Sequence, residues 1–351
     1  MADNELRSSE ERKITIYDIA REAGVSPSTV SRVLTNTSGV GEAKRVLVQK
    51  IIDKYNFRPN ALARGLSETR RKAIGIIMAD VRNPFYSKLF VECERYARLA
   101  GYSLLLQNSL GKQDIEESQL QFMEEQRVDA VILVGGRVDD LHSCSEFVDI
   151  VNRVNNSIPV ILTGRLDGTS CNQVRIDAIK AMDLVMDHLL ELGHTRIAMV
   201  GGDDKVTASF EKKKRYLQIL SRYHISVPPE YYDTKGGYDY DSGYWETERL
   251  LKLPDIPTAI IGINDSESIG AINCLTEHGF KVPEDVSVIS YDNTYLSDLA
   301  VPKLTSIDYN YDVFAKTLID TVEGIYASKD IPSVQLIEPR LVVRNSCRNI
   351  R

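Results

Sequence analysis

The stretch ITIYDIAREAGVSPSTVSRVL, residues 14–34, carries the local signals for two short helices separated by a tight turn. Thr15 followed by Asp18 matches a capping box, in which the two residues satisfy each other's backbone N–H groups. Apolar residues then recur at helical spacing as far as Gly24: Ile16, Ile19, Ala20 and Ala23. This pattern predicts a first helix that stops at a glycine turn.

A second helix is predicted to begin only three residues after Gly24. Ser26 is a favoured N-cap residue, and Pro27 suits the first helical position because its missing N–H would have no intrahelical partner there. Val30, Val33 and Leu34 fall on one face. Two short helices joined by such a turn form the helix-turn-helix, whose second helix enters the major groove of DNA.

In a helix-turn-helix, the residues at the start of the second helix point at DNA. Here these are Pro27, Ser28 and Arg32, and an arginine can donate two hydrogen bonds to a guanine edge. Thr29 and Ser31 can reach phosphate oxygens. The alternative for this segment is an ordinary helical hairpin with a surface arginine.

A third helix is predicted over residues 42–55, with the apolar residues of its buried side being Leu47, Val48, Ile51, Ile52 and Tyr55. Three helices can close a small core. Phe57-Arg58-Pro59-Asn60 ends this helix, and a weakly helical segment, residues 60–66, leads to the basic residues 70–72.

Charge is divided unevenly along the chain, whose net charge is -7. The first 72 residues contain 14 Lys and Arg against 9 Asp and Glu, whereas the rest contains 29 against 41. A basic head on an acidic body is expected when only one end of a protein meets phosphate.

Length and composition favour two or three soluble domains. The chain has 351 residues, more than one core usually serves, and no stretch approaches the roughly 20 apolar residues of a membrane span. The N-terminus lacks the apolar middle of a secretory signal, so we expect a cytoplasmic protein. The five cysteines are scattered without a C-x-x-C pair, which predicts buried small hydrophobic residues rather than disulfides or a zinc site.

Residues 73–351 alternate apolar strands with amphipathic helices in two successive halves. The expected strands of the first half are AIGIIMAD, YSLLLQ, AVILVGG and PVILTGR, and those of the second are RIAMVGG, YYDTKGG, TAIIGIND and VSVISYDN. This alternation predicts parallel sheets with crossover helices. In such sheets ligands bind outside the carboxyl ends of the strands.

The sequence ITIYDIAREAGVSPSTVSRVL followed by FRPNALARGL resembles the DNA-binding head and hinge of the lactose/galactose repressor (LacI/GalR) family. The resemblance implies a disordered tail at 1–13, a helix-turn-helix domain at 14–59 and a hinge helix at 60–72 that forms when two subunits pair on the operator. Leu66 would wedge into the minor groove. The implied DNA-contacting residues are Thr15, Tyr17, Ser26, Pro27, Ser28, Thr29, Ser31, Arg32, Asn60, Ala63 and Leu66.

Several residues of the head depart from the family pattern. Thr35 stands where Asn is frequent, and Gly41 stands where a Ser or Thr usually caps the third helix. Residues 44–47 read Lys-Arg-Val-Leu where Thr-Arg-Glu-Lys is common, which leaves phosphate contacts from the third helix open. Gly65 lowers helix propensity by about 1 kcal/mol relative to alanine, so the hinge is expected to be largely unfolded off DNA.

Over residues 73–351 the chain is similar to the periplasmic-binding-protein-like (type I) sensor of the same family, which has two lobes with a ligand cleft between them. The resemblance implies an N-lobe of about 73–176 and 309–338 and a C-lobe of about 177–308 and 339–351. Matching landmarks include Asn83-Pro84-Phe85-Tyr86, Asn264-Asp265, VPEDVSVISYDN and LVVRNSC.

The residues that match effector-binding positions of the family combine aromatic rings with polar side chains. They are Phe85, Tyr86, Arg165, Lys212, Tyr238, Asn264, Asp265, Asp292 and Tyr311. Aromatic faces with carboxylate, amide and guanidinium groups suit a sugar. Structural alternatives remain, since Asn264-Asp265 fits a helix cap, Phe85 fits core packing and Arg165 fits a surface ion pair.

Three departures affect the effector prediction. Lys212 replaces an effector-contacting arginine, and a lysine is a point charge where arginine is a two-pronged donor. Asp177-Ala178 replaces Asp-Asn, and Gly164 stands where some members have Asp. The basic run 212–215 also fits a solvated helix face.

Together these observations predict a transcriptional regulator, a repressor by resemblance, that binds a palindromic operator as a homodimer and responds to a small molecule. The five histidines lack metal-ligand spacing, and the G-x-G-x-x-G, P-loop, H-E-x-x-H and G-x-S-x-G motifs are absent, so we expect neither an enzyme nor a cofactor or metal. The alternatives are a sugar-binding protein without a DNA function and a regulator that requires a purine-type co-repressor.

Overall fold

The computed structural model describes residues 14–34, 39–55, 57, 71–234 and 236–351. The chain divides into two compact units, Met1–Arg71 and Lys72–Arg351. The expected tail at 1–13 and residues 60–70 of the expected hinge lie outside the described residues.

The first unit contains three helices, α1 (Ile16–Glu22), α2 (Pro27–Leu34) and α3 (Glu42–Lys54). The capping box predicted for Thr15 and Asp18 is formed, with each side chain hydrogen-bonded to the other's backbone N–H. Side chains from the three helices close a small core, in which Ile19, Val30 and Val48 are fully buried. The prediction of a three-helix head with a helix-turn-helix is confirmed.

The second unit begins with a lobe built on a six-stranded sheet, which we call the N-lobe. Its elements are β1 (Ala73–Met78), α5 (Pro84–Leu99), β2 (Ser103–Asn108), α6 (Gln113–Gln126), β3 (Ala130–Val134), η1 (Gly136–Asp139), α7 (Ser145–Asn155), β4 (Val160–Leu162), β5 (Asn172–Ile176), α13 (Tyr311–Tyr326) and β10 (Val334–Ile337). The strand order is β10-β5-β4-β3-β1-β2, and all neighbours are parallel. Helices α5 and α13 cover one face, and α6 and α7 cover the other.

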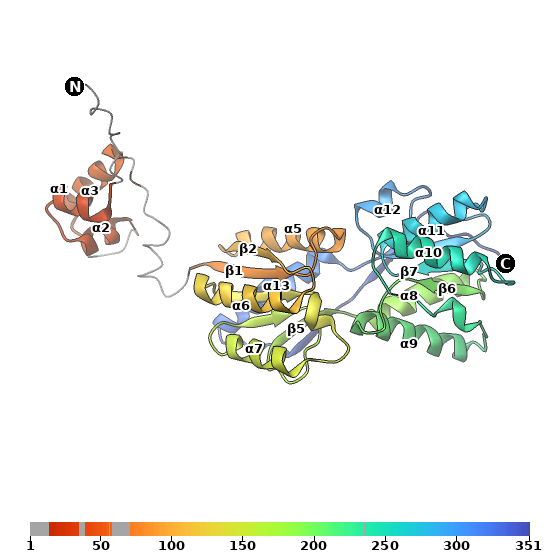
Figure 1. The fold of residues 1–351 in the computed structure, drawn as a ribbon. Coiled ribbons are helices and arrows are strands. Elements are labelled where there is room, and N and C mark those ends of the chain that lie inside the picture. The colour runs from red at the N-terminus through yellow and green to blue at the C-terminus, as the bar shows by residue number, and fades with distance from the viewer. Residues whose placement is uncertain (1–13, 35–38, 56, 58–70, 235) are drawn as a thin grey trace, which may run out of the picture. The chain divides into compact units, whose positions relative to one another are not determined.

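The other lobe, the C-lobe, has a five-stranded sheet. Its elements are α8 (Ala178–Glu191), β6 (Ile197–Val200), α9 (Thr207–Arg222), η2 (Pro229–Tyr231), α10 (Tyr240–Leu251), β7 (Ala259–Gly262), α11 (Asp265–Glu277), β8 (Ser287–Asp292), α12 (Tyr295–Leu299), β9 (Thr305–Asp308) and β11 (Arg340–Val342). The order is β11-β9-β8-β7-β6, with only β11 antiparallel to its neighbour. Helices α8 and α9 cover one face, and α10 and α11 cover the other (Figure 1).

The chain passes between the lobes three times. The passages follow β5, β9 and β10, because each of these strands belongs to one sheet and the next element packs in the other lobe. The predicted two-lobe α/β architecture is therefore confirmed.

The expectation of a strand at residues 231–237 is wrong. Tyr231 ends the short helix η2, and its buried side chain donates to the carbonyl oxygen of Asp255. The two glycines that follow, Gly236 and Gly237, have φ values of 90° and 114°, which lie outside the strand region. The described residues of this segment, 231–234 and 236–237, therefore form no strand.

Helices α10 and α11 pack closely because each has a glycine that faces the backbone of the other helix. A Cβ on Gly270 would lie 2.2 Å from the carbonyl oxygen of Tyr240, a position that only a backbone shift could relieve. We expect Gly270→Ala to lower the free energy of unfolding by about 1–3 kcal/mol, since overpacking a tight contact costs this much. Urea unfolding followed by circular dichroism measures the loss. Thr276→Ala, at an exposed position on the same helix, is the control, and equal stability of the two variants would contradict the expectation.

Candidate functional site

The first turn of α2 presents a set of hydroxyl groups that hydrogen-bond one another. Ser26 Oγ lies 2.8 Å from Ser28 Oγ and 2.9 Å from Thr29 Oγ1, and it also accepts from the Thr29 backbone N–H. Ser26 therefore caps the helix as predicted. Ser28 and Arg32 are exposed on the same helix, whereas Pro27, Thr29 and Ser31 are half-buried.

The other predicted DNA-contacting residues divide into two groups. Thr15 and Tyr17 are exposed at the start of α1, with 66% of Tyr17 accessible to solvent. Asn60, Ala63 and Leu66 lie outside the described residues. Gly41 precedes α3 and provides no side-chain cap, as its departure from the family pattern implies.

Between the lobes of the second unit, aromatic side chains from α5 meet those that follow β9. Phe85 packs edge-on against Tyr86 at a centroid distance of 5.0 Å and against Tyr309 at 5.9 Å. Tyr311 lies 5.9 Å from the same Phe85 ring. Three of the predicted effector-binding residues, Phe85, Tyr86 and Tyr311, thus form one continuous aromatic cluster, and Tyr309 belongs to it as well.

Lys212 of α9 is buried at the edge of this cluster. Its Nζ donates to the hydroxyl of Tyr309 at 3.0 Å and lies 4.0 Å from the centre of the Tyr291 ring. The Tyr309 hydroxyl in turn donates to the carboxylate of Asp292, so one tyrosine joins the cation to the anion. Burial lowers the pKa of Lys212, and the negative charges of Asp292 and Glu267 oppose this shift.

Asp292 ends β8 with a φ of 87°, a conformation that Asp adopts more readily than most residues. Burial raises the pKa of its carboxyl group, and Asp265 adds to the shift, while Lys212 opposes it. The backbone carbonyl of Asp292 accepts from the Tyr311 hydroxyl at 2.9 Å. Lys212, Tyr309 and Asp292 therefore form a buried polar chain within the aromatic cluster.

Asp265 fixes the backbone beside Asp292, and both of its carboxylate oxygens accept hydrogen bonds from the protein. Its Oδ1 accepts from Ser290, Ser297 and Ser306 at 2.7–3.1 Å, and its Oδ2 accepts from the N–H and hydroxyl of Thr294 at 2.6 and 2.8 Å. Five donors from the C-lobe leave the carboxylate engaged with the protein. Asp265 thus positions the loop after β8.

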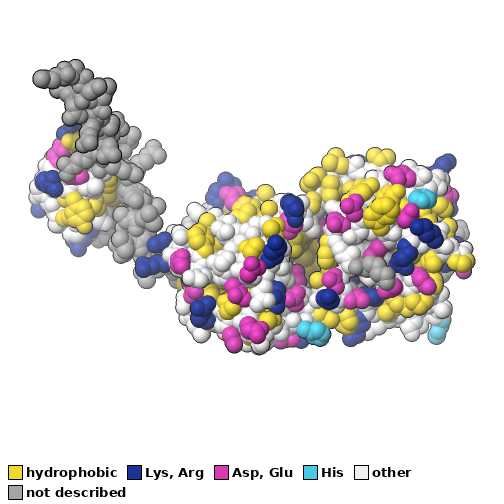
Figure 2. Space-filling model, viewed as in Figure 1, with side chains coloured by type: hydrophobic (Ala, Val, Ile, Leu, Met, Phe, Trp, Pro, Cys, Tyr) yellow, Lys and Arg dark blue, Asp and Glu magenta, His cyan; other side chains and the backbone are white. Residues whose placement is uncertain are grey.

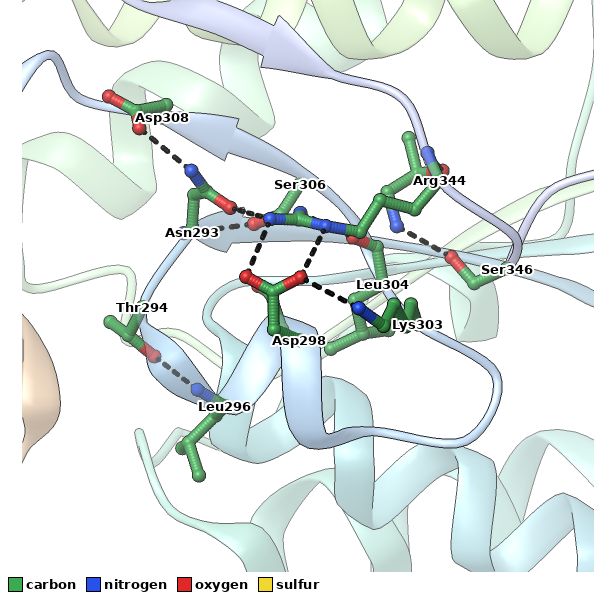
Figure 3. A network of polar contacts seen from close by, with 12 residues as sticks. Asn293, Thr294, Leu296, Asp298, Lys303, Leu304, Ser306, Asp308, Arg344 and Ser346 are labelled. Atoms are coloured by element: carbon green, nitrogen blue, oxygen red, sulfur yellow. Dashed lines mark hydrogen bonds and ion pairs between the residues drawn. The ribbon is translucent and has the colours of Figure 1, made fainter.

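The same loop is fixed from the other side through Asn293 (Figure 3). The Asn293 amide donates to Asp308 at 2.7 Å and its carbonyl accepts from Arg344 at 2.8 Å, while Arg344 also pairs with Asp298. From the N-lobe, Lys88 Nζ donates to the backbone carbonyl of Asn293 at 2.6 Å. This bond joins the two lobes beside Asp292.

The polar groups of three predicted site residues form hydrogen bonds or ion pairs with other groups of the protein. Asn264 caps α11 through Glu267 N–H at 2.9 Å and donates to the carbonyl of Tyr238, so the helix-cap alternative holds for it. Arg165 is exposed and makes a two-pronged ion pair with Asp167 at 2.7 and 2.9 Å, which is the surface-pair alternative. The Tyr238 hydroxyl bonds to Ser209 at 2.8 Å, although 39% of the residue stays exposed.

Sequence reasoning missed two residues that connect the site, Tyr309 and Lys88. Tyr309 directly follows the end of β9, just as Asp292 ends β8, so its place at a strand end is the sequence signal that could have found it. Lys88 sits one helical turn after Pro84 on the face that carries Phe85, and only the opposite lobe supplies its partner.

Other sequence expectations concern cysteines and membranes. The five thiols are unpaired, as predicted. The prediction that all of them are buried is wrong for Cys144 and Cys347, which are half-buried. Within the described ranges, no group of three or more His, Cys, Asp or Glu is arranged to hold a metal. No helix in those ranges is long and apolar enough to cross a bilayer.

Comparison with known proteins decides the family. Residues 15–60 match the family model of the lacI family of bacterial regulatory proteins, and residues 186–347 match the periplasmic binding protein-like domain. The chain is 35% identical to catabolite control protein A of Priestia megaterium over 296 residues, which cover 84% of this chain and 87% of that protein. This chain belongs to the lacI family.

Two further proteins extend the match of this lacI-family chain over nearly its whole length. The HTH-type transcriptional repressor PurR of Actinobacillus pleuropneumoniae serotype 3 (strain JL03) is 32% identical over 343 residues, 96% of this chain and 99% of that one. A lac repressor dimer bound to operator and the anti-inducer ONPF superposes with a TM-score of 0.85 at 24% identity, covering 96% and 100% of the two chains.

As a lacI-family protein, the chain is a DNA-binding transcription regulator with an effector-binding domain. The two relatives are named as a control protein and a transcriptional repressor. The predicted head, two-lobe body and regulatory function are therefore confirmed.

Proposed function

We propose that this lacI-family chain is a transcriptional repressor that binds a two-fold symmetric operator as a homodimer and responds to a small carbohydrate held between its lobes. We assign residues 14–59 to DNA binding, 60–72 to a hinge and 73–351 to effector binding. The observation that carries the proposal is the pair of exposed polar residues on α2, Ser28 and Arg32, in one chain with a two-lobe unit that contains a buried polar chain. The protein acts on the chromosome in the bacterial cytosol and catalyses no reaction.

On the DNA side, Ser28 and Arg32 are the proposed base readers, because both are exposed on α2, the second helix of the helix-turn-helix, which enters the major groove. Thr15, Tyr17, Ser26, Pro27, Thr29 and Ser31 are assigned to the surrounding phosphate and groove contacts. Asn60, Ala63 and Leu66 are assigned to the minor groove by family resemblance alone.

Large apolar side chains on the C-lobe support the homodimer. Tyr295, Leu299 and Val301, in and after α12, are 63%, 70% and 87% exposed, and Trp245 of α10 is 61% exposed. Figure 2 shows hydrophobic side chains gathered where α11 and α12 reach the surface. Exposed apolar patches of this kind mark protein interfaces. Pairing two copies of the chain around a two-fold axis would cover the patch on each copy. Elution as a monomer at micromolar concentration would contradict the dimer.

For the effector we keep Phe85, Tyr86, Lys212, Tyr238, Asp292 and Tyr311 as the binding set. Asp265 and Asn264 are reassigned to positioning, because the protein itself uses their polar atoms. Arg165 remains a candidate that would have to leave Asp167 to reach a ligand. Apolar rings with a few fixed polar groups are the common composition of a small-molecule site.

The experiment that tests the DNA function selects random duplexes on the full-length protein at about 150 mM salt, where non-specific phosphate binding is weak. We expect enrichment of a palindrome. Arg32→Ala is then expected to lower the affinity for the selected site by about 1–3 kcal/mol, because a two-pronged contact to a base is lost.

Arg21→Ala is the matched control, since Arg21 is an exposed arginine on α1 that pairs with Asp18 of the same helix. It should leave sequence preference unchanged. If Arg32→Ala weakened selected and random duplexes equally, Arg32 would be a phosphate contact and its assigned role would be wrong. If a palindrome emerged only with a purine base added, the co-repressor alternative would replace the carbohydrate.

A further inference from the structure

The segment after β3 crosses from the N-lobe to meet the C-lobe. Asp140 forms an isolated antiparallel bridge with Val206, and Leu141 N–H donates to the carbonyl of Lys205 at 2.6 Å. The Thr207 hydroxyl adds a bond to the carbonyl of Asp140 at 3.2 Å. Asp139, the last residue of η1, therefore directly precedes a contact between the two lobes.

The carboxylate of Asp139 fills the space in front of Gly164. A Cβ on Gly164 would lie 2.4 Å from Asp139 Oδ1 and 2.1 Å from the carbonyl oxygen of Val138. That carbonyl accepts from Arg165 N–H at 2.6 Å, which fixes η1 against the end of β4. The absence of a side chain at Gly164 thus lets a carboxylate from the neighbouring strand end occupy this position.

The Asp139 carboxylate lies within electrostatic reach of tyrosines from both lobes. Its charge raises the pKa of the Tyr86 hydroxyl on the N-lobe and of the Tyr238 hydroxyl on the C-lobe, in each case after the larger effect of burial. Burial and the neighbouring Asp140 raise the pKa of Asp139 itself to about 6. Arg137 Nε forms an ion pair with Asp140 Oδ2 at 2.8 Å. Among the described residues, by contrast, none forms an ion pair or a hydrogen bond with the carboxylate of Asp139.

From this geometry we propose that Asp139 is the N-lobe carboxylate that binds two adjacent hydroxyl groups of the effector and selects a neutral carbohydrate. The assignment rests on the function proposed above. Two neighbouring hydroxyls can donate to the two oxygens of one carboxylate, which is a strong, directional pairing. A phosphorylated sugar would place a second anion beside Asp139, so it is disfavoured at this position.

Binding at Asp139 would also couple to lobe closure, because the residue is one peptide bond from the Asp140–Val206 bridge. A ligand that orders the carboxylate orders the segment that contacts the C-lobe. The effector would thereby stabilise the contact between residues 140–141 and the C-lobe.

The test measures thermal stabilisation of the full-length protein by D-glucose, D-ribose, cellobiose, 2-deoxyglucose, glucose 6-phosphate and hypoxanthine, followed by calorimetric titration of those that stabilise it. Asp139→Asn is compared with Asp149→Asn, an exposed aspartate of the same lobe. We expect Asp139→Asn to weaken binding of a neutral sugar by a factor on the order of 10–100 and Asp149→Asn to leave it unchanged, since charged hydrogen bonds are lost only at the first.

Each other outcome overturns a distinct claim. Undiminished sugar binding by Asp139→Asn would overturn the role of Asp139 and leave the carbohydrate effector standing. Stabilisation of the wild type by hypoxanthine or glucose 6-phosphate alone would overturn the neutral-sugar assignment. A wild type that no carbohydrate stabilises would overturn the effector class itself. Melting temperatures without ligand show that both variants are folded.

Discussion

Asp265→Ala is expected to lower the free energy of unfolding of the two-lobe unit by about 3–5 kcal/mol, because several buried donors lose their acceptor together. The hydroxyls of Ser290, Ser297 and Ser306 and the backbone N–H of Thr294 all donate to this carboxylate. They come from β8, α12, β9 and the loop between β8 and α12, so the loss reaches four parts of the C-lobe.

Urea unfolding followed by circular dichroism measures this loss. Asp255→Ala, at an exposed position in the same lobe, should change stability by less than about 0.5 kcal/mol. Asp265→Asn keeps one acceptor oxygen and should fall between the two. If Asp265→Ala proved as stable as Asp255→Ala, the hydrogen bonds to Asp265 would not support the loop, and its reassignment to positioning would fail.

Lys212→Met is expected to cost about 3–5 kcal/mol at pH 8, because it leaves the Asp292 carboxylate buried without its cation. The cost should shrink as the pH falls. The pKa of Asp292 in the folded protein lies above that of an unfolded chain, so the folded state takes up its proton first and ionisation on raising the pH disfavours folding. Removing Lys212 raises this pKa further, since the lysine charge is one of the groups that lower it.

The titration of Lys212 also makes the stability cost of Lys212→Met smaller at low pH. Its folded pKa is depressed by burial, so the wild-type protein bears the cost of a buried ammonium at low pH, and the methionine variant does not. The difference in unfolding free energy between the two proteins, measured at pH 5 and pH 8, should therefore be larger at pH 8.

A double variant separates the charge effect from lost packing. Lys212→Met with Asp292→Asn removes both charges, and Asn also suits the positive φ of this position, so most of the lost stability should return. Lys214→Met, exposed on the same helix, is the control. An equal loss at both pH values with no rescue by Asp292→Asn would show that the charges of Lys212 and Asp292 are not coupled.

Local signals were enough to predict the head. Capping by Thr15 and Ser26, the proline at position 27 and the spacing of Ile19 and Val30 all act within a few residues, and the three helices formed where these signals placed them. The apolar strands were equally clear, since parallel strands are buried on both faces. The exception, residues 231–237, lacked that continuous apolar character.

The effector site was predicted less completely, because its residues depend on partners far away in the sequence. Asn264 and Asp292 both stand at strand ends and look equivalent in the sequence. Only the fold shows that Asn264 is used to cap α11, whereas Asp292 joins Lys212 through Tyr309. The partner of Lys88 and the surroundings proposed to give Asp139 its role both depend on the contact between the lobes.

By itself, then, the sequence determined that this protein has a helix-turn-helix head and a two-lobe α/β body, since hydrophobic period and capping are properties of short segments. The tertiary structure decided which polar side chains form hydrogen bonds within the protein and which do not. Asp265 and Asp139 illustrate the division, because a carboxylate's role depends on the donors around it, and those donors are brought together only when distant strands and helices pack.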